Sequence, residues 1–405
     1  MKYKTSITNK FEKPVLDFGK MPLGNGFIVK KDFKKEYFFN MKVLFDEELG
    51  LFQLAEYPRP KKMFNVNYPF FTASSKSMVK HFKDFSLWVK KKYIKKKKIN
   101  LIEIGSNDCT FLNFFQNKNI TTIGFEPAKN FKKFYSKNGI KHINNFFNKP
   151  NCKKNISNIK NKVDIIIAAN VICHIPNLEN LFKGVDYSLN KKGFFIFEEP
   201  YLFDMYERVS FDQIYDEHIY IFSVYSISKI CKKFNFELVN CCHQKTHGGS
   251  MRYVVARAGE QKIKPNVDKY IKREVKKKYH LKIGVKNFKN KIDKNKKKIL
   301  KEIKSLKKRG AKIYGYAATS KSTTVLNYFK LNSNCINGIF DSTPQKIGKF
   351  SPGAHIPILD ARNIKKFNVK IFYLFAWNHT QEILKKENTF LKNGGKFICH
   401  VNLKK

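Results

Sequence analysis

The sequence predicts an α/β protein in which two sheet-forming segments follow a short front module. Short apolar runs alternate with amphipathic stretches over residues 81–258, and the same alternation starts again at residue 312. This pattern is typical of βαβ units and a largely parallel sheet. A lysine-rich segment, residues 259–308, separates the two. At 405 residues, the chain has room for two or three domains of about 150 residues.

The front module, residues 1–80, is expected to be a small mixed unit. Its strand-like runs are short and are separated by turn signals at Pro22, Gly24 and Gly26. The strands expected here cover residues 15–18, 42–45 and 51–54.

The two larger segments carry most of the expected strands. In residues 81–258 these are 99–105, 120–126, 163–170, 193–200 and 252–257, with helices such as 177–189 between them. Beyond residue 309 they are 312–318, 336–341, 369–377 and 396–401. The connector 259–308 favours a helix because its apolar positions recur at helical spacing. Those positions are Ile292, Ile299, Leu300, Ile303 and Leu306.

The formal net charge of +48 suggests a nucleic-acid partner, but the kind of cation argues against one. Only seven of the 80 basic residues are arginine, the side chain that nucleic-acid sites favour. The lysine runs at 90–92, 95–98 and 296–298 are therefore interpreted as solvated faces or linkers. A strongly positive field still attracts anionic small molecules such as nucleotide sugars.

A soluble cytoplasmic protein is the default expectation. The chain contains no run of about 18 uncharged apolar residues, and its first twenty residues have no apolar signal-peptide core. We therefore expect no membrane partner. The eight cysteines include no CxxC pair, which favours a reduced protein without a metal. Oligomeric state cannot be read from the sequence.

The strongest local motif is IEIGSNDCT, residues 102–110, where a strand runs into a tight polar turn. A second strand ends at Glu126, 21 positions after Gly105, near the spacing at which an acid meets a ribose diol. The turn lacks a GxGxxG series, so a cofactor without phosphates near the loop is favoured. S-adenosylmethionine fits this requirement. The residues expected to contact it are Glu103, Gly105, Ser106, Asn107, Asp108, Glu126, Pro127 and Asn170.

Longer motifs extend over nearly the whole chain. They include PVLDFGKMPLGNGF, NYPFFTASS, EIGSNDCTFL, NVICHIPNL, EEPYLFDMYERVSFDQIYDEHIYIFS, THGGSMR, GYAATSKSTTVLNYF and FDSTPQKIGKFSPGAHIPI, in that order. With these motifs the chain resembles the sugar C-methyltransferases, S-adenosylmethionine-dependent enzymes that methylate a ring carbon of nucleotide-linked deoxysugars. The resemblance implies a zinc-binding-like front module, a central class I methyltransferase (Rossmann-like) domain at 81–258, and a C-terminal Rossmann-like domain at 309–405 that holds the sugar nucleotide.

The chain departs from this family at two points. Members usually bind a structural zinc through four cysteines in the front module, whereas the first cysteine here is Cys109. We therefore expect no zinc, and a front module held by packing alone. Cys109 itself stands where the family commonly has glycine, which could weaken cofactor binding.

Methylating a carbon beside a ketone requires removal of a weakly acidic C–H proton before the enolate attacks the sulfonium methyl group. His218, in YDEHIYIFS, is the expected base because imidazole exchanges protons near neutral pH. Glu217 resembles the family's acid in this motif, and the Tyr215 phenol can donate a hydrogen bond. His174 and Tyr68 resemble residues that line the reaction centre, although a turn histidine and simple aromatic packing remain alternatives.

The substrate is expected to meet the THGGSMR loop and the C-terminal domain. The candidates are His247, Gly248, Arg252, Lys321 and Asp341. Arg252 and Lys321 would contact phosphates, and Asp341 follows a strand at a ribose-type position. A surface arginine and a Rossmann copy that has lost binding are the alternatives.

The sequence thus predicts an S-adenosylmethionine-dependent C-methyltransferase that acts on a nucleotide-diphosphate keto-deoxysugar, with no nucleic-acid partner. The alternatives are another small-molecule methyltransferase, such as one acting on oxygen, a basic nucleic-acid-binding protein, or a non-catalytic relative.

Overall fold

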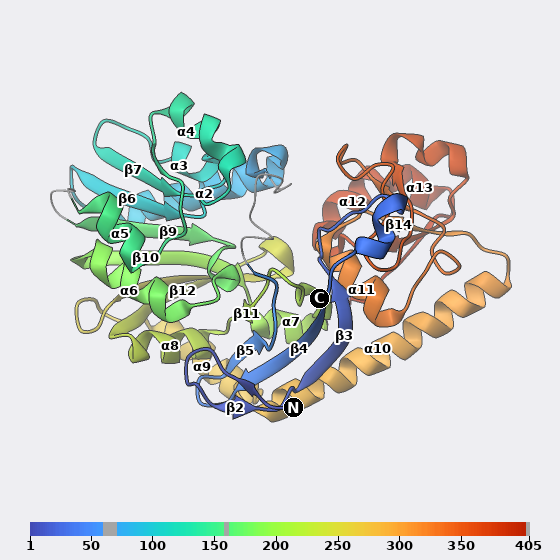
Figure 1. Cartoon of the computed structure of the whole chain (residues 1–405), viewed down its shortest axis with the longest axis horizontal. Coiled ribbons are helices and arrows are strands. Elements are labelled where there is room, and N and C mark those ends of the chain that lie inside the picture. Colours follow the sequence, from blue (N-terminus) through green and yellow to red (C-terminus); the bar gives the residue numbers. More distant parts are fainter. Residues whose placement is uncertain (60–70, 158–161, 402–405) are drawn as a thin grey trace.

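The computed structural model describes residues 1–59, 71–157 and 162–401 and shows an α/β chain built around three sheets. In Figure 1 the central sheet and the C-terminal sheet lie on opposite sides of the molecule, and the front strands run below and between them. Tyr68 lies outside the described residues. Within those ranges, no helix combines the length and the apolar character that crossing a membrane requires.

The front sheet is antiparallel and contains the three strands expected there. Its order is β11-β5-β4-β3, and a two-stranded ribbon of β1 and β2 lies beside it. The bounds are β1 (Tyr3–Lys4), β2 (Phe11–Glu12), β3 (Leu16–Pro22), β4 (Phe38–Asp46), β5 (Leu51–Leu54) and β11 (Tyr220–Ile221). β11 begins two residues after His218, so the central segment of the chain completes the front sheet.

The central sheet has seven strands in the order β12-β13-β10-β9-β6-β7-β8. The five strands from β10 to β8 are parallel, and β13 is antiparallel to both of its neighbours. The bounds are β6 (Ile99–Ile104), β7 (Ile120–Phe125), β8 (Lys141–Ile143), β9 (Val163–Ala169), β10 (Leu189–Pro200), β12 (Phe236–Gln244) and β13 (Ser250–Arg257). The five strands expected in this segment are confirmed, and β8 and β12 were not expected.

Helices cover both faces of the central sheet because its buried strands are apolar on both sides. Leu101, Ile165 and Ile167 pack with α2 on one face, while Ile102 and Ile166 belong to the cluster on the other. The helices of this part are α2 (Lys76–Tyr93), α3 (Thr110–Asn113), α4 (Lys132–Asn138), α5 (Lys149–Ile156), α6 (Leu178–Ser188), α7 (Leu202–Arg208) and α8 (Val224–Lys233).

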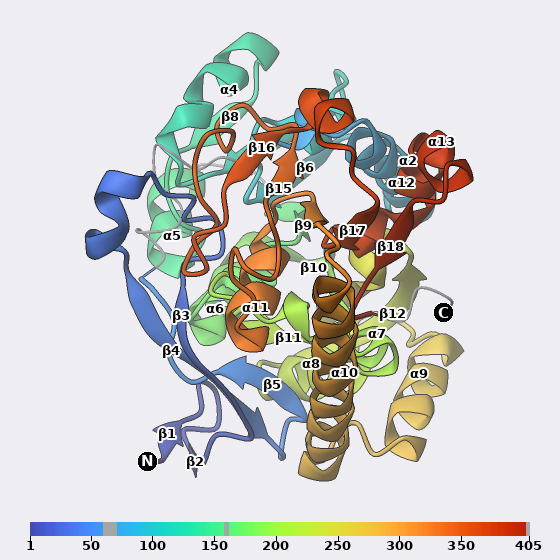
Figure 2. The same cartoon turned by 90° about the vertical axis from the view of Figure 1, so that its right-hand side faces the viewer.

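The connector is helical, as expected, and leads into a third, all-parallel sheet. α9 (Pro265–Lys276) precedes the long α10 (Lys282–Lys308), which crosses from the central part to the C-terminal part in Figures 1 and 2. Ile292, Ile299 and Ile303 on α10 are buried.

The third sheet has the order β16-β15-β14-β17-β18. Its strands are β14 (Ile313–Tyr316), β15 (Ile339–Asp341), β16 (Ile358–Asp360), β17 (Ile371–Leu374) and β18 (Lys396–Ile398), with helices α11 (Ser320–Phe329), α12 (Thr380–Lys386) and α13 (Asn388–Lys392). The four strands expected here are confirmed, and β16 is additional.

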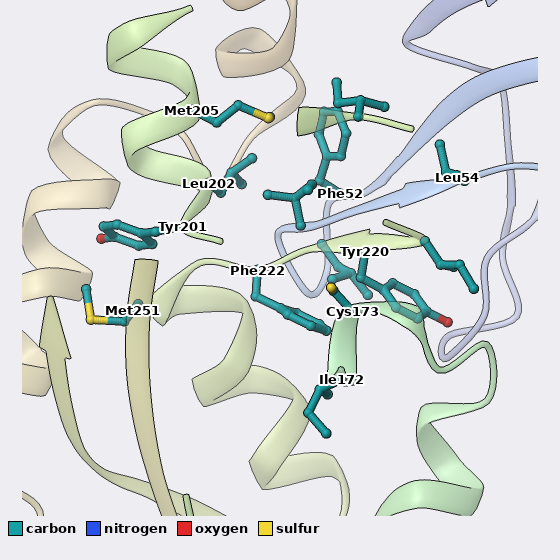
Figure 3. Close-up of a cluster of buried hydrophobic side chains, with 14 of the residues drawn as sticks. Phe52, Leu54, Ile172, Cys173, Tyr201, Leu202, Met205, Tyr220, Phe222 and Met251 are labelled. Carbon is teal, nitrogen blue, oxygen red and sulfur yellow. The ribbon is translucent and has the colours of Figure 1, made fainter. Parts of the chain in front are cut away.

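One continuous apolar cluster joins the three parts of the chain. It runs from Leu16 in the front sheet through Phe222 and Val285 to Ile398 in the last strand. Figure 3 shows a section of it, in which Phe52 and Leu54 of β5 lie near Tyr220 and Phe222 of the central segment. The shared core holds the parts in a fixed relation, which the site between them requires.

Candidate active site

A cavity of about 540 Å³ is lined by residues from all three parts of the chain. One wall comes from the carboxyl ends of β6, β7 and β9, and another from residues 213–218. Residues 319–321 and 376–379 of the C-terminal part contribute a further side. β6 and β9 are neighbours at the point where the strand order reverses, which is where open α/β sheets bind their ligands.

Gly105 lets the backbone turn sharply at the end of β6. Its φ is +68°, and a Cβ atom there would lie 2.5 Å from Val171 Cγ2. Only glycine is compatible with both the conformation and the close approach. Asn107, Ser106 and Asn170, all expected cofactor contacts, line the cavity around this turn.

Glu126 follows β7 and lines the same part of the cavity. Its carboxylate accepts hydrogen bonds from the backbone N–H groups of Asn107 (2.9 Å) and Ala128 (2.8 Å). Burial raises its pKa to about 7, against the effect of these two bonds. Glu103, on β6, also lines the cavity, and burial raises its pKa. Its Oε2 has no hydrogen-bond partner within the described ranges. Both acids are therefore placed to accept hydrogen bonds from a ligand.

Two other expected cofactor residues have different surroundings. Pro127 lines the cavity beside Glu126. Asp108 does not line it, because its carboxylate accepts hydrogen bonds from the backbone of Ala73 (2.8 Å) and Thr110 (3.2 Å). Asp108 thus ties the segment before α2 to the turn after β6.

His218 has a single favoured tautomer, set by its two hydrogen bonds. Nδ1 lies 2.7 Å from the carbonyl oxygen of Gln213, which can only accept, so Nδ1 carries the proton. Nε2 therefore has the free lone pair, and it lies 2.9 Å from the hydroxyl of Tyr215, which donates to it. Burial holds the pKa of His218 well below its usual value, with the neighbouring His174 acting in the same direction. The ring is a neutral base at physiological pH.

Glu217 and Asp216 are held by the front module. The Asn25 side-chain amide donates to Glu217 Oε1 (2.8 Å), and the Gly24 N–H donates to Asp216 Oδ1 (2.8 Å). Burial raises the pKa of Glu217, and the neighbouring Asp216 carboxyl adds to the effect. A protonated Glu217 can donate a hydrogen bond into the cavity, which it lines.

His174 lies at the end of the short helix η4 (Ile172–His174), after β9. Its ring centroid is 5.3 Å from that of His218, and both rings line the cavity. Burial lowers the pKa of His174 to about 4, so this ring is also neutral at pH 7. The structure thus brings together His174, Tyr215, Glu217 and His218 of the expected catalytic set.

Lys321 and His247 also line the cavity. Burial lowers the pKa of Lys321, although Asp212 opposes the shift. Its Nζ lies 4.9 Å from the ring centroid of Trp377 and has no hydrogen-bond partner in the described part of the chain. The His247 ring is 3.2 Å from the Asn170 amide, and burial lowers its pKa to about 3.

Three residues expected to contact the substrate do not line the cavity. Arg252 donates two hydrogen bonds to Glu198 Oε2 (2.8 and 3.0 Å), so its guanidinium is already paired. Asp341 accepts the backbone N–H groups of Ala318 and Thr343, both at 2.7 Å. Gly248 packs on Trp377, where a Cβ atom would lie 2.2 Å from the ring. We leave these three out of the site proposed below.

Gln213 is a cavity residue that sequence reasoning missed. Its side chain is 1% exposed, and neither amide atom has a hydrogen-bond partner among the described residues. A buried amide without partners is costly, by about 1–3 kcal/mol per group. Its position inside the DQIYDEH motif was the available signal.

The central sheet and its cavity define a class of protein. If the seven strands of the central sheet are renumbered 1 to 7 along the chain, their order in the sheet is 6-7-5-4-1-2-3, and only strand 7 is antiparallel to its neighbours. A glycine turn follows strand 1, and an acid follows strand 2 beside that turn. This is the arrangement of class I S-adenosylmethionine-dependent methyltransferases.

Comparison with known families matches three successive parts of the chain. Residues 8–64 match the "Putative zinc binding domain", residues 79–240 the "Methyltransferase domain" and residues 245–402 the "C-methyltransferase C-terminal domain". "C-methyltransferase NovU" of Streptomyces niveus is 25% identical over 390 residues, covering 96% of this chain and 92% of that protein. The chain is thus an S-adenosylmethionine-dependent methyltransferase whose last part matches a C-methyltransferase C-terminal domain.

Solved structures with a limited likeness cover the methyltransferase part. An S-adenosylmethionine-dependent methyltransferase from Clostridium acetobutylicum is 13% identical, with a TM-score of 0.35, and the match covers 45% of this chain and 92% of that one. The magnesium protoporphyrin IX methyltransferase of Synechocystis, solved with bound S-adenosylmethionine, is 10% identical with a TM-score of 0.33, covering 44% and 79%.

The front module does not fit the zinc ion that its family description names. Structural zinc sites use cysteine thiolates and histidine nitrogens. Residues 8–64 contain neither cysteine nor histidine. The acids there have other partners in the structure: Asp46 accepts a hydrogen bond from Thr8, and Glu48 pairs with Lys10. No step of the chemistry below involves a metal in this module.

Proposed function

We propose that this C-methyltransferase methylates a ring carbon beside a ketone on a nucleotide-diphosphate keto-deoxysugar. The observation that carries the proposal is the tautomer of His218. Its Nδ1–H is bound to the Gln213 carbonyl, so the basic Nε2 is presented on the cavity side together with Tyr215. The buried imidazole is neutral, so its Nε2 can accept a proton, and the anionic enolate formed beside it would stabilise the imidazolium.

The turn after β6 and the acid after β7 fit S-adenosylmethionine. Gly105 allows close approach, Glu126 can accept from ribose hydroxyls, and Glu103 Oε2 is a buried acceptor without a partner among the described residues. S-adenosylmethionine supplies an electrophilic methyl group on its sulfonium.

His218, Tyr215 and Glu217 carry out the proposed proton transfers. His218 Nε2 takes the proton from carbon, directly or through the Tyr215 hydroxyl that is hydrogen-bonded to it. Glu217, whose pKa burial raises, keeps its proton near neutral pH and can donate to the ketone oxygen as negative charge develops there. His174 is neutral and lies beside His218, where it can hold substrate without adding a competing charge.

The position of Lys321 is evidence that the substrate is anionic. It is a buried cation that faces the cavity, and an unpaired buried cation is costly unless a ligand neutralises it. A diphosphate would do so, while the adjacent sugar could reach the His218 side. The net charge of +48 also raises the local concentration of anions.

The test is methyl transfer from a ¹³C-methyl donor to a panel of nucleotide-linked 4-keto sugars, with wild type and His218→Asn compared. Losing the base is expected to lower kcat by at least about 100-fold, while calorimetry gives an S-adenosylmethionine Kd within about twofold of wild type. The matched control is His243→Asn, because His243 is exposed on β12 and outside the cavity. Unchanged turnover in the His218 variant would remove this residue from the mechanism. A product with an O–CH₃ rather than a C–CH₃ carbon signal would assign the methyl group to oxygen.

A further inference from the structure

Three side chains that bind soft metals converge beside the cavity. Cys173 Sγ and one ring nitrogen each of His174 and His218 all lie within 4.8 Å of one another. The group is not apparent from the sequence, because His218 lies 44 positions after His174. A cysteine with two histidines is a ligand set that suits zinc and similar borderline-soft ions.

The surroundings match those of metal-binding histidines. Such histidines usually donate the second ring N–H to a carbonyl or carboxylate, which fixes the tautomer and directs the other nitrogen at the metal. His218 has this arrangement, because Nδ1 donates to the Gln213 carbonyl at 2.7 Å and leaves Nε2 as the donor atom. The Tyr215 hydroxyl at 2.9 Å is the group that a metal at Nε2 would displace.

Cys173 lies on the buried side of the group, where its thiol is hydrogen-bonded to the Glu199 carboxyl. It is fully buried, and Figure 3 shows it between Ile172 and the rings of Tyr220 and Phe222. His174 and His218 face the cavity. A metal bound to all three would therefore keep its fourth position open to the cavity, as three-ligand zinc sites do.

We infer that Cys173, His174 and His218 form an inhibitory site for Zn²⁺. A tetrahedral zinc with bonds of about 2.0–2.3 Å needs ligand atoms roughly 3.5 Å apart, so modest side-chain rotations complete the site. On binding, the Zn–S bond forms as the S–H bond breaks, and the thiol proton passes to the buffer. The same Nε2 lone pair serves as base and as ligand, so zinc blocks proton abstraction. This second half of the inference rests on the proposed function, whereas metal binding does not.

Metal binding is tested on the full-length protein by titration with Co²⁺, followed through the thiolate-to-cobalt charge-transfer band, and with Zn²⁺ by calorimetry. The variants are Cys173→Ala and, as a matched control, Cys231→Ala, which removes another fully buried cysteine outside the cavity. Wild type and the control are expected to bind one equivalent with the thiolate band. Cys173→Ala is expected to lose the band and to bind zinc at least about tenfold more weakly.

Two results would overturn the site: equal affinity and an unchanged band in Cys173→Ala, or no thiolate band in wild type. If Cys173→Ala does not fold, X-ray absorption on wild type with one equivalent of zinc decides, since a shell without sulfur contradicts the inference. In the methyl-transfer assay, zinc should inhibit wild type and the control but spare Cys173→Ala. Failure of every sugar substrate would refute the proposed function and leave the binding results standing.

Discussion

Cys109 occupies a backbone conformation that suits glycine. Its φ is 64°, in the left-handed region, and it directly precedes α3 at the end of the cofactor turn. Its side chain is fully buried, and burial raises the pKa of the thiol, so it is not a reactive thiolate. A cysteine in place of glycine at this position therefore adds local backbone strain of about 1–2 kcal/mol, but the turn still forms.

This strain predicts a difference between two variants at position 109. Cys109→Gly removes both the side chain and the penalty of positive φ, whereas Cys109→Ala removes the sulfur and keeps the penalty. We expect the glycine variant to be more stable than the alanine variant by about 0.5–1 kcal/mol, measured by urea unfolding. An alanine variant as stable as the glycine variant would show that the turn relaxes without strain.

At the residue scale, sequence motifs with a defined type and spacing named residues that line one cavity in the structure. Gly105 and Glu126 were recognisable because a strand, a turn and a second strand fix their separation. His218 and Glu217 followed from one intact motif. The sequence predicts that Arg252 contacts a phosphate, whereas the structure pairs its guanidinium with Glu198 of the neighbouring strand, a contact that the sequence does not show. The group of Cys173, His174 and His218 could not be predicted from the sequence, because only folding brings these residues together.

Glu198 and Arg252 face each other across the β10–β13 pair of the central sheet. Both are buried, and His81 of α2 contacts the other Glu198 oxygen at 2.7 Å. Burial alone would raise the pKa of Glu198, but His81 and Arg252 outweigh it and lower the pKa to about 2. The Arg252 guanidinium also lies 3.4 Å above the Phe85 ring, so this contact fastens α2 to the sheet.

Replacing Glu198 with Gln is expected to destabilise the fold by about 3–5 kcal/mol, because Arg252 would remain buried without its counter-charge. The free energy of unfolding from urea titration measures this. Since the folded pKa is below the ordinary value of glutamate, the contribution is present above pH 4.5 and is lost as pH falls through about 2. The control Glu179→Gln breaks an exposed helical pair with Lys183 and should cost about 0.5 kcal/mol or less.

Element prediction worked for strands with continuous apolar runs and failed for the others. β8 is only three residues long, and β12 carries Glu237, Asn240 and His243 within its span. β12 is an edge strand, so it tolerates polar side chains that a central strand would not. β11 could not be predicted at all, because two residues become a strand only by pairing with β5.

Asp212 connects the loop that leads to His218 with the C-terminal part at the scale of the whole molecule. Trp377 Nε1 donates to Asp212 Oδ2 at 2.6 Å, and His400 Nε2 lies 3.3 Å from Asp212 Oδ1. Burial alone would lower the pKa of His400, but Asp212 raises it to about 10. Asp212 directly precedes Gln213, whose carbonyl orients His218, so the contact between the two parts lies next to the His218 ring.

We expect His400→Gln to destabilise the protein by about 3 kcal/mol at pH 7, because Asp212 loses its buried cation. The folded pKa of His400 is above the ordinary histidine value of 6.5, so its contribution is complete below that pH and is lost as pH rises through about 10. The difference between wild type and variant in urea unfolding should therefore shrink from pH 7 to pH 10. A difference that does not change with pH would show that His400 is not charged in the native state.

The pairing of β5 with β11 has a consequence for how the protein is made. A ribosome joins Leu51–Leu54 of β5 long before Tyr220–Ile221 of β11. Strands β3, β4 and β5 must therefore wait, with the β5 edge unpaired, until the segment that contains His218 has emerged. Removing residues 1–54 would take away β5, the partner strand of β11, so a fragment that begins at Ala55 is expected to lose the order of the segment around His218.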